Sequence, residues 1–218
     1  LVQPLDNFVA RIMQSLRSMA DRLDSRLIAD IMTYNSEMVI SPLDEPSPKM
    51  DNQVFLGSKA FHLKKLLIRK FPVPHGFVIT SEVFRRNSTI NALPALQKEF
   101  HELILKHLRR LERLTGCLYA DADRPLLLSV RSGTAISMPG AMDTLLNVGL
   151  NDELATRIAE NPRYSWAIWD SYRRLLQSWG MAHGIERDTF DSVMIAFKRR
   201  EQVKQKVQFS AAQMEQIA

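Results

Sequence analysis

The residues best suited to chemistry lie in one stretch near the middle of the chain. Two apolar segments, 125–130 and 145–150, are joined by a polar loop that contains Arg131, Ser132, Gly133, Thr134, Pro139, Gly140, Asp143 and Thr144. An arginine at the end of a strand offers a rigid fork of N–H donors that matches phosphate oxygens. Small neighbours let backbone N–H groups approach the same oxygens. The pattern fits a phosphate-holding loop and, equally well, an ordinary hairpin that carries an exposed arginine.

A second candidate residue is Lys59, in the segment Leu56-Gly57-Ser58-Lys59-Ala60. Apolar residues downstream predict that this segment opens a helix, with Lys59 in the first turn. A cation there is unfavourable to the helix dipole, unless it reaches back toward an anion gathered at the helix start. An ordinary surface lysine is the plainer alternative.

The elements that must position these residues are mostly helical. We expect a short strand over Phe77–Thr80, a helix capped by Ser81, and a long amphipathic helix from Leu93 to Thr115 that Gly116 ends. Further helices are predicted over 151–160, 164–179 and 188–204, and a last one from Ser210. Helices are many and strands few, so we predict a mixed α/β (α+β) fold with only part of a sheet.

The first fifty residues differ from the rest. Between Leu5 and Met32 apolar residues recur at steps of three and four, which predicts one long amphipathic helix. The segment 41–49 then carries three prolines and is expected to be a linker. We therefore divide the chain into a helical arm with a Pro-rich linker, 1–50, and a main body, 51–218.

Composition narrows the class of protein. With 218 residues, 45% hydrophobic and 24% charged, the chain matches an ordinary globular protein. No apolar run is long enough to span a membrane, and a single cysteine, Cys117, fits a reducing cytoplasm. The basic run over 198–206 is interrupted, and a solvated helix face is favoured there over a nucleic-acid surface. No zinc spacing, Walker loop or Rossmann glycine fingerprint is present, and we predict no metal ligands in this chain.

Several segments together resemble the family of pyruvate phosphate dikinase and phosphoenolpyruvate synthase. Residues 56–60 and Pro72-Val73-Pro74-His75-Gly76-Phe77-Val78-Ile79-Thr80 are similar to the opening motifs of that group. The dikinase branch is resembled more closely by Ser129-Val130-Arg131-Ser132-Gly133, Ser137 to Thr144, Asn147 to Asp152, and Trp169-Asp170-Ser171-Tyr172-Arg173-Arg174 with Gly180. The resemblance spans about residues 52–218, in order, and leaves out the arm.

This resemblance implies the first lobe of an ATP-grasp domain, with ATP as ligand and Mg²⁺ as its companion ion. In the family, the lysine of the opening motif and the arginine of the Val-Arg-Ser motif hold ATP phosphates, which carries over to Lys59 and Arg131. The glycine and threonine of the Pro-Gly-x-x-Asp-Thr loop lie against the nucleotide, which carries over to Gly140 and Thr144. The opening motif departs from the family at Ser58, where a second glycine is usual.

The resemblance also implies partners that we expect outside this chain. In the family, a second ATP-grasp lobe supplies the carboxylates for magnesium, a phosphohistidine domain receives the phosphoryl group, and a barrel binds pyruvate. We therefore expect the ATP-binding portion of a cytoplasmic phosphotransferase, inactive by itself, that passes phosphate from ATP through a histidine to pyruvate or a similar acceptor. Two alternatives stay open: a non-catalytic ATP-binding or regulatory module that dimerises through the arm, and a helical interaction protein with a decayed version of the fold.

Overall fold

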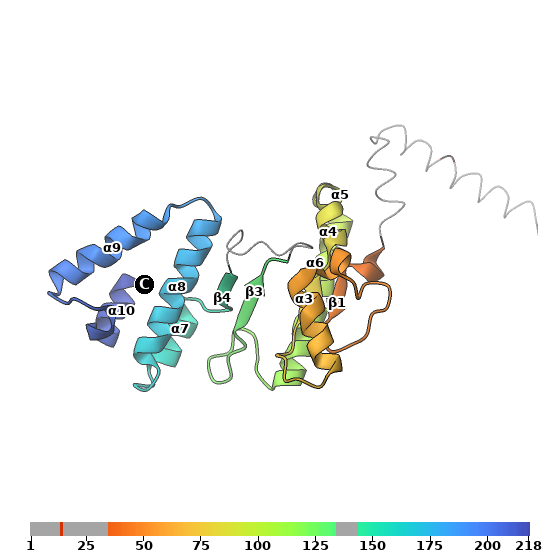
Figure 1. Cartoon of the computed structure of the whole chain (residues 1–218). Helices are drawn as coiled ribbons and strands as arrows, with labels where there is room; N and C mark the ends of the chain where they lie inside the picture. Colours follow the sequence, from red (N-terminus) through yellow and green to blue (C-terminus); the bar gives the residue numbers. More distant parts are fainter. Residues whose placement is uncertain (1–13, 15–34, 134–143) are drawn as a thin grey trace, which may run out of the picture. The chain divides into compact units, whose positions relative to one another are not determined.

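The computed structural model describes Gln14 and residues 35–133 and 144–218, and the predicted helix over 5–32 lies outside these except for Gln14. By its contacts the chain divides into two compact units, Leu1–Lys106 and His107–Ala218. The division 1–50 and 51–218 made from the sequence stays a prediction. In the described residues, helices alternate with two small antiparallel sheets of two strands each (Figure 1). This confirms the α+β class.

The first unit begins with a turn of 3₁₀ helix, η1 (Ser36–Met38), and a short strand, β1 (Ile40–Pro42). β1 pairs antiparallel with β2 (Phe77–Ile79), with Ile40 opposite Ile79. β2 confirms the expected strand. β1 was not expected, because it lies partly in the segment predicted as a linker. Pro42 is tolerated there because it is the last residue of an edge strand in a sheet of only two strands.

Four helices complete the first unit: α3 (Gln53–Ile68), α4 (Ser81–Arg85), α5 (Asn87–Ala92) and α6 (Pro94–Thr115), the last of which continues into the second unit. The predicted cap of α4 was wrong by one residue. Thr80 is the N-cap, and its hydroxyl accepts a hydrogen bond from the N–H of Glu82. The Thr80 hydroxyl also donates to the carbonyl of Met38 at 2.6 Å, which ties the start of α4 to the last residue of η1. Ser81 is the first helical residue.

The second unit contains the hairpin of β3 (Leu128–Arg131) and β4 (Thr144–Val148), followed by α7 (Asp152–Ala159), α8 (Ser165–Ala182), α9 (Arg187–Arg200), η2 (Lys206–Gln208) and α10 (Ala211–Ile217). Local signals explain most of the boundaries. Gly116 has φ of 71° and follows the end of α6, while Asn151 caps α7 and Ser210 caps α10 through its side chain. These confirm the helix starts and stops predicted there.

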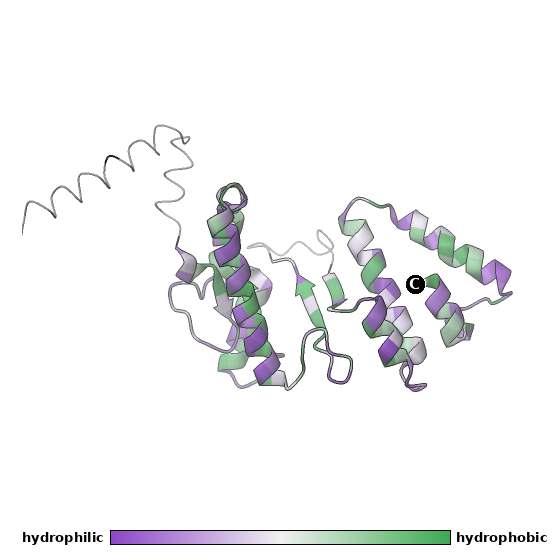
Figure 2. Cartoon of the chain, turned by 180° about the vertical axis from the view of Figure 1, so that it is seen from behind, coloured by the Kyte–Doolittle hydropathy of each residue, from purple (hydrophilic) through white to green (hydrophobic). Residues whose placement is uncertain are grey.

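The hydrophobic core of the second unit lies where α8 meets α7, α10 and β4. Its buried members are Leu150, Leu154, Ala155, Ile168, Trp169, Tyr172, Leu175, Phe209 and Met214. Trp166 on α8 donates its indole N–H to the carbonyl of Phe209, between η2 and α10, at 3.0 Å. In Figure 2 hydrophobic colour on β3 gives way to hydrophilic colour at one end of the strand, and the last residue of β3 is Arg131.

Candidate functional site: a phosphate-binding hairpin and a helix start

The β3–β4 hairpin places two of the predicted site residues side by side. Arg131 is the last residue of β3, Thr144 is the first residue of β4, and the two are direct cross-strand partners. Such partners have Cβ atoms about 5 Å apart on the same face of the sheet. The loop that joins them, 132–143, includes Gly140, which lies outside the described residues. The mouth of the hairpin therefore presents an arginine and a threonine hydroxyl on one face.

A β-bulge interrupts the pairing below this mouth. Val130 lies opposite Leu145 and Leu128 lies opposite Val148, so one residue of β3 faces two residues of β4. Asn147, one of the two, has φ of 60°. Asparagine is among the few residues other than glycine that adopt this left-handed conformation readily.

The extra residue decides which way the two ends of β4 face. In a regular strand Thr144 and Val148, four residues apart, would point to the same face. With the bulge, Thr144 shares the face of Arg131, while Val148 packs against the hydrophobic core. The bulge thus lets one short strand serve both the candidate site and the core, and it was not expected from the sequence.

The side chain of Arg131 is exposed, and it is anchored within its own strand. Its Nε donates a hydrogen bond to Oγ of Ser129 at 3.1 Å. The two residues are two apart on β3 and therefore share a face. Strand alternation was the signal that could have singled out Ser129.

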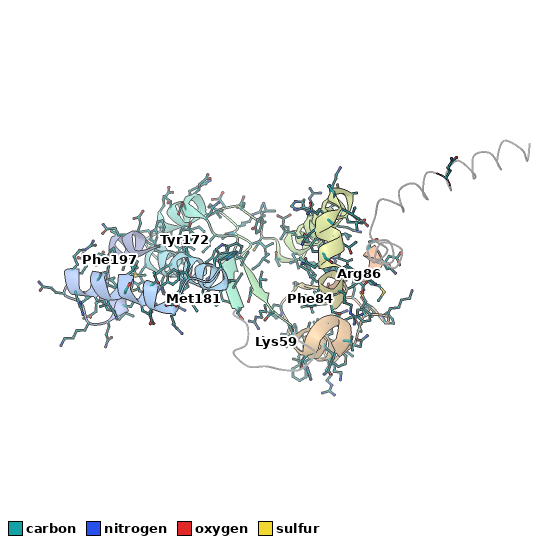
Figure 3. The ribbon with its side chains drawn as sticks, turned by 90° about the horizontal axis from the view of Figure 1, so that it is seen from above. Lys59, Phe84, Arg86, Tyr172, Met181 and Phe197 are labelled. Carbon is teal, nitrogen blue, oxygen red and sulfur yellow. The ribbon has the colours of Figure 1, made fainter. Side chains whose placement is uncertain are left out.

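Lys59 lies in the first unit, on α3, where Figure 3 labels its side chain. The helical backbone of α3 is interrupted at Gly57, whose φ of 74° and ψ of 162° are not helical. That region of backbone space is essentially restricted to glycine. The break puts Lys59 in the first turn of the helical stretch that follows Gly57, and the side chain is exposed. Arg131 and Thr144 belong to the second unit.

One charged cluster of the first unit was not foreseen. The ammonium of Lys64 on α3 is buried and donates to Oγ of Ser41, to the carbonyl of Glu45 at 2.8 Å and to the carboxylate of Asp51. Asp51 also accepts from the backbone N–H of Ser47. These bonds tie the segment 41–51 to the same helix that carries Lys59, so they contribute to holding that helix in place.

A second cluster surrounds Asp170 in the second unit. The Asp170 carboxylate is 8% exposed and contacts Arg173 at 3.0 Å, Arg174 at 3.1 Å and Lys206 at 2.7 Å. Burial opposes its charge, but hydrogen bonds from Lys206 and Arg173 outweigh burial and hold the pKa of Asp170 below its usual value. Asp170 is thus a structural hub that joins α8 to η2, 36 residues away along the chain.

Tyr172 belongs to the same helix and is buried in the core. Burial and a hydrogen bond to Asp152 raise the pKa of its phenol. Asp170 and Tyr172 therefore both contribute to the packing of α8.

Within residues 35–133 and 144–218, no three His, Cys, Asp or Glu side chains lie close enough together to hold a metal ion. The expectation that magnesium ligands lie outside this chain stays a prediction. In the same part of the chain no helix is long and apolar enough to cross a membrane.

Comparison with known proteins shows that the β3–β4 hairpin and the helix start at Lys59 lie in a part of the chain that is similar to one group of enzymes. No family model matches the chain. The chain is 34% identical over 163 residues to a pyruvate, phosphate dikinase of Rhizobium meliloti, covering 74% of this chain and 18% of the relative. It is 35% identical over 178 residues to that of Giardia intestinalis, covering 81% and 20%. It is 38% identical over 163 residues to the chloroplastic pyruvate, phosphate dikinase 1 of Arabidopsis thaliana, covering 74% and 17%.

The chain belongs to the pyruvate, phosphate dikinase family. It spans about a fifth of the length of these relatives. A match over 81% of the chain must include residues 59–144 wherever it begins, so both candidate elements fall within the part shared with a dikinase. Two relatives are named as chloroplastic, and the cytoplasmic location expected for this chain stays a prediction.

Proposed function

We propose that this chain forms the ATP-binding portion of a dikinase-type phosphotransferase, and that its two units carry residues of the first lobe of an ATP-grasp domain. Lys59 and Arg131 hold the phosphates of ATP, and Gly140 and Thr144 lie against the nucleotide. The observation that carries the proposal is the pairing of Arg131 with Thr144 at the mouth of the hairpin, within a segment shared with dikinases.

The chemistry of the two cations suits this role. Phosphoryl transfer depends mainly on positioning and on charge stabilisation. The Arg131 guanidinium can grip two phosphate oxygens at once, whereas the Lys59 ammonium acts as a point charge. The Thr144 hydroxyl can donate to an oxygen or accept from a ribose hydroxyl. None of these groups takes up the phosphoryl group, so they bind and orient ATP without receiving phosphate.

The remaining steps belong to groups that we place outside this chain. Magnesium, held by carboxylates of a second lobe, would neutralise phosphate charge, and a histidine on another domain would accept the phosphoryl group before pyruvate or a similar acceptor. On this proposal the 218-residue chain binds ATP and does not turn it over by itself.

Calorimetric titration of the chain with ATP tests the proposal. A charge-assisted hydrogen bond contributes about 1.5–3 kcal/mol, so Arg131→Ala and Lys59→Ala should each weaken ATP binding about tenfold or more. Arg187→Ala and Lys98→Ala remove exposed cations from helix surfaces and should leave the affinity unchanged. Absence of saturable ATP binding by the unmodified chain, or unchanged affinity in both site variants, would contradict the proposal.

A further inference from the structure

We infer that Ser129 is a positioning residue for the phosphate site, acting through Arg131. The inference rests on the proposed function, because it assigns to Ser129 the task of presenting the Arg131 guanidinium to ATP phosphates. Its basis is the bond from Nε of Arg131 to Oγ of Ser129 at 3.1 Å, which joins two exposed side chains of one strand.

The direction of this bond sets where the guanidinium lies. Ser129 and Arg131 are on the same face of β3, about 7 Å apart along the strand. To reach the Ser129 hydroxyl, the Arg131 side chain turns back along the strand and lies over the face that also carries Thr144. Without this partner an arginine at the end of a strand would be free to extend into solvent.

The bond also uses only one of the donors of the guanidinium. A guanidinium has five N–H donors, one on Nε and four on the two terminal nitrogens. The Ser129 bond engages Nε alone, so it leaves available the edge formed by the two terminal nitrogens, which can donate to two phosphate oxygens in parallel. Ser129 therefore orients the fork without occupying its tip.

The expected benefit is preorganisation. An exposed arginine has many rotamers, and binding a ligand must restrict them. If Ser129 already restricts the rotamers of Arg131 in the free chain, ATP binding does not have to restrict them, and the affinity for ATP is higher as a result. Loss of the hydroxyl should then weaken ATP binding by about three- to tenfold, less than loss of Arg131 itself.

A double-mutant cycle on the full chain separates this role from a general structural one. We expect Ser129→Ala to weaken ATP binding about three- to tenfold, and Ser129→Thr, which keeps a hydroxyl and suits a strand, to stay within about twofold of the unmodified chain. In the Arg131→Ala background, Ser129→Ala should have no further effect, because its only route to the ligand is gone. Ser192→Ala, which removes an exposed hydroxyl from α9, is the matched control, and thermal melting verifies that each variant is folded.

The outcomes distinguish two failures. If Arg131→Ala leaves ATP affinity unchanged, the proposed function itself is wrong. If Arg131→Ala weakens binding but Ser129→Ala does not, or if the effect of Ser129→Ala persists in the Arg131→Ala background, the proposed function stands and the positioning role of Ser129 is refuted. If Ser129→Thr binds as weakly as Ser129→Ala, the hydroxyl is not the active group and the inference also fails.

Discussion

Replacing Asp170 by Asn should destabilise the second unit strongly, although the change is nearly isosteric. The carboxylate is buried, and the bonds it accepts from Arg173 and Lys206 are charge-assisted. Arg174 is 56% exposed, so its pairing with Asp170 is largely screened by solvent and adds little. Removing one partner of a buried ion pair costs about 3–5 kcal/mol.

The expected loss of stability in Asp170→Asn is smaller than this range for two structural reasons. Lys206 is 26% exposed and can regain water, and the Asn amide oxygen can still accept one hydrogen bond. We therefore expect Asp170→Asn to lower the free energy of unfolding by about 2–3 kcal/mol, which is about 8–12 °C in melting temperature for a domain of this size.

Urea and thermal unfolding followed by circular dichroism provide the assay. The matched control is Asp191→Asn on α9, whose carboxylate lies 3.9 Å from Arg187 with both side chains more than half exposed. A surface pair of this kind contributes about 0–1 kcal/mol. If Asp170→Asn costs no more stability than Asp191→Asn, the assignment of Asp170 as a buried hub is wrong.

Three further predictions concern pH and backbone geometry. The pKa of Asp170 is depressed in the folded chain. Its contribution to the free energy of unfolding is therefore present above the unfolded pKa of about 3.9 and is lost as pH falls through the lower folded pKa. In urea titrations the stability gap between the unmodified chain and Asp170→Asn should narrow from pH 5 to pH 3, and a constant gap would contradict this. Asn147→Val should lower the free energy of unfolding by about 1–3 kcal/mol, because valine disfavours the left-handed backbone at this position, and it should weaken ATP binding by disturbing the bulge. Asn147→Gly should have neither effect. Equal effects of the two substitutions would refute the role of the bulge. Gly57→Ala should likewise lower the free energy of unfolding by about 1–3 kcal/mol. It should also reduce the ATP affinity measured by calorimetry, because the start of the helix that carries Lys59 must shift. An unchanged melting temperature would argue against the break at Gly57.

Local signals allowed much of the helical architecture to be predicted. Asn151, Ser210 and Gly116 act on the backbone within a few residues of themselves, so their effect can be derived without knowing the fold. The N-cap of α4 shows where local reasoning ends. Thr80 and Ser81 are adjacent hydroxyl residues, and the bond from Thr80 to Met38, 42 residues away, accompanies the choice of Thr80.

Long-range pairing explains the features that the sequence could not reveal. β1 forms in a proline-containing segment because residues 77–79 pair with it. The hub at Asp170 depends on Lys206, and the charged cluster at Lys64 depends on Ser41. Each of these contacts joins residues far apart along the chain, which no periodicity or spacing encodes.

The candidate site was predictable in part. Arg131 and Thr144 were singled out by residue type and by family resemblance, and the structure makes them cross-strand partners. Strand alternation places Ser129 on the face of Arg131, whereas the role of Asn147 depends on the bulge and follows only once the register of the hairpin is known.

Hydrogen exchange of the whole chain with and without ATP, read by mass spectrometry, tests the central claim most directly. We predict that ATP slows exchange of backbone amides over residues 57–62 and 129–148, that both segments respond with the same ATP concentration dependence, and that adenosine at equal concentration has no such effect. Slowed exchange confined to other segments, or equal protection by adenosine, would contradict the assignment of Lys59 and Arg131 as the phosphate-binding residues.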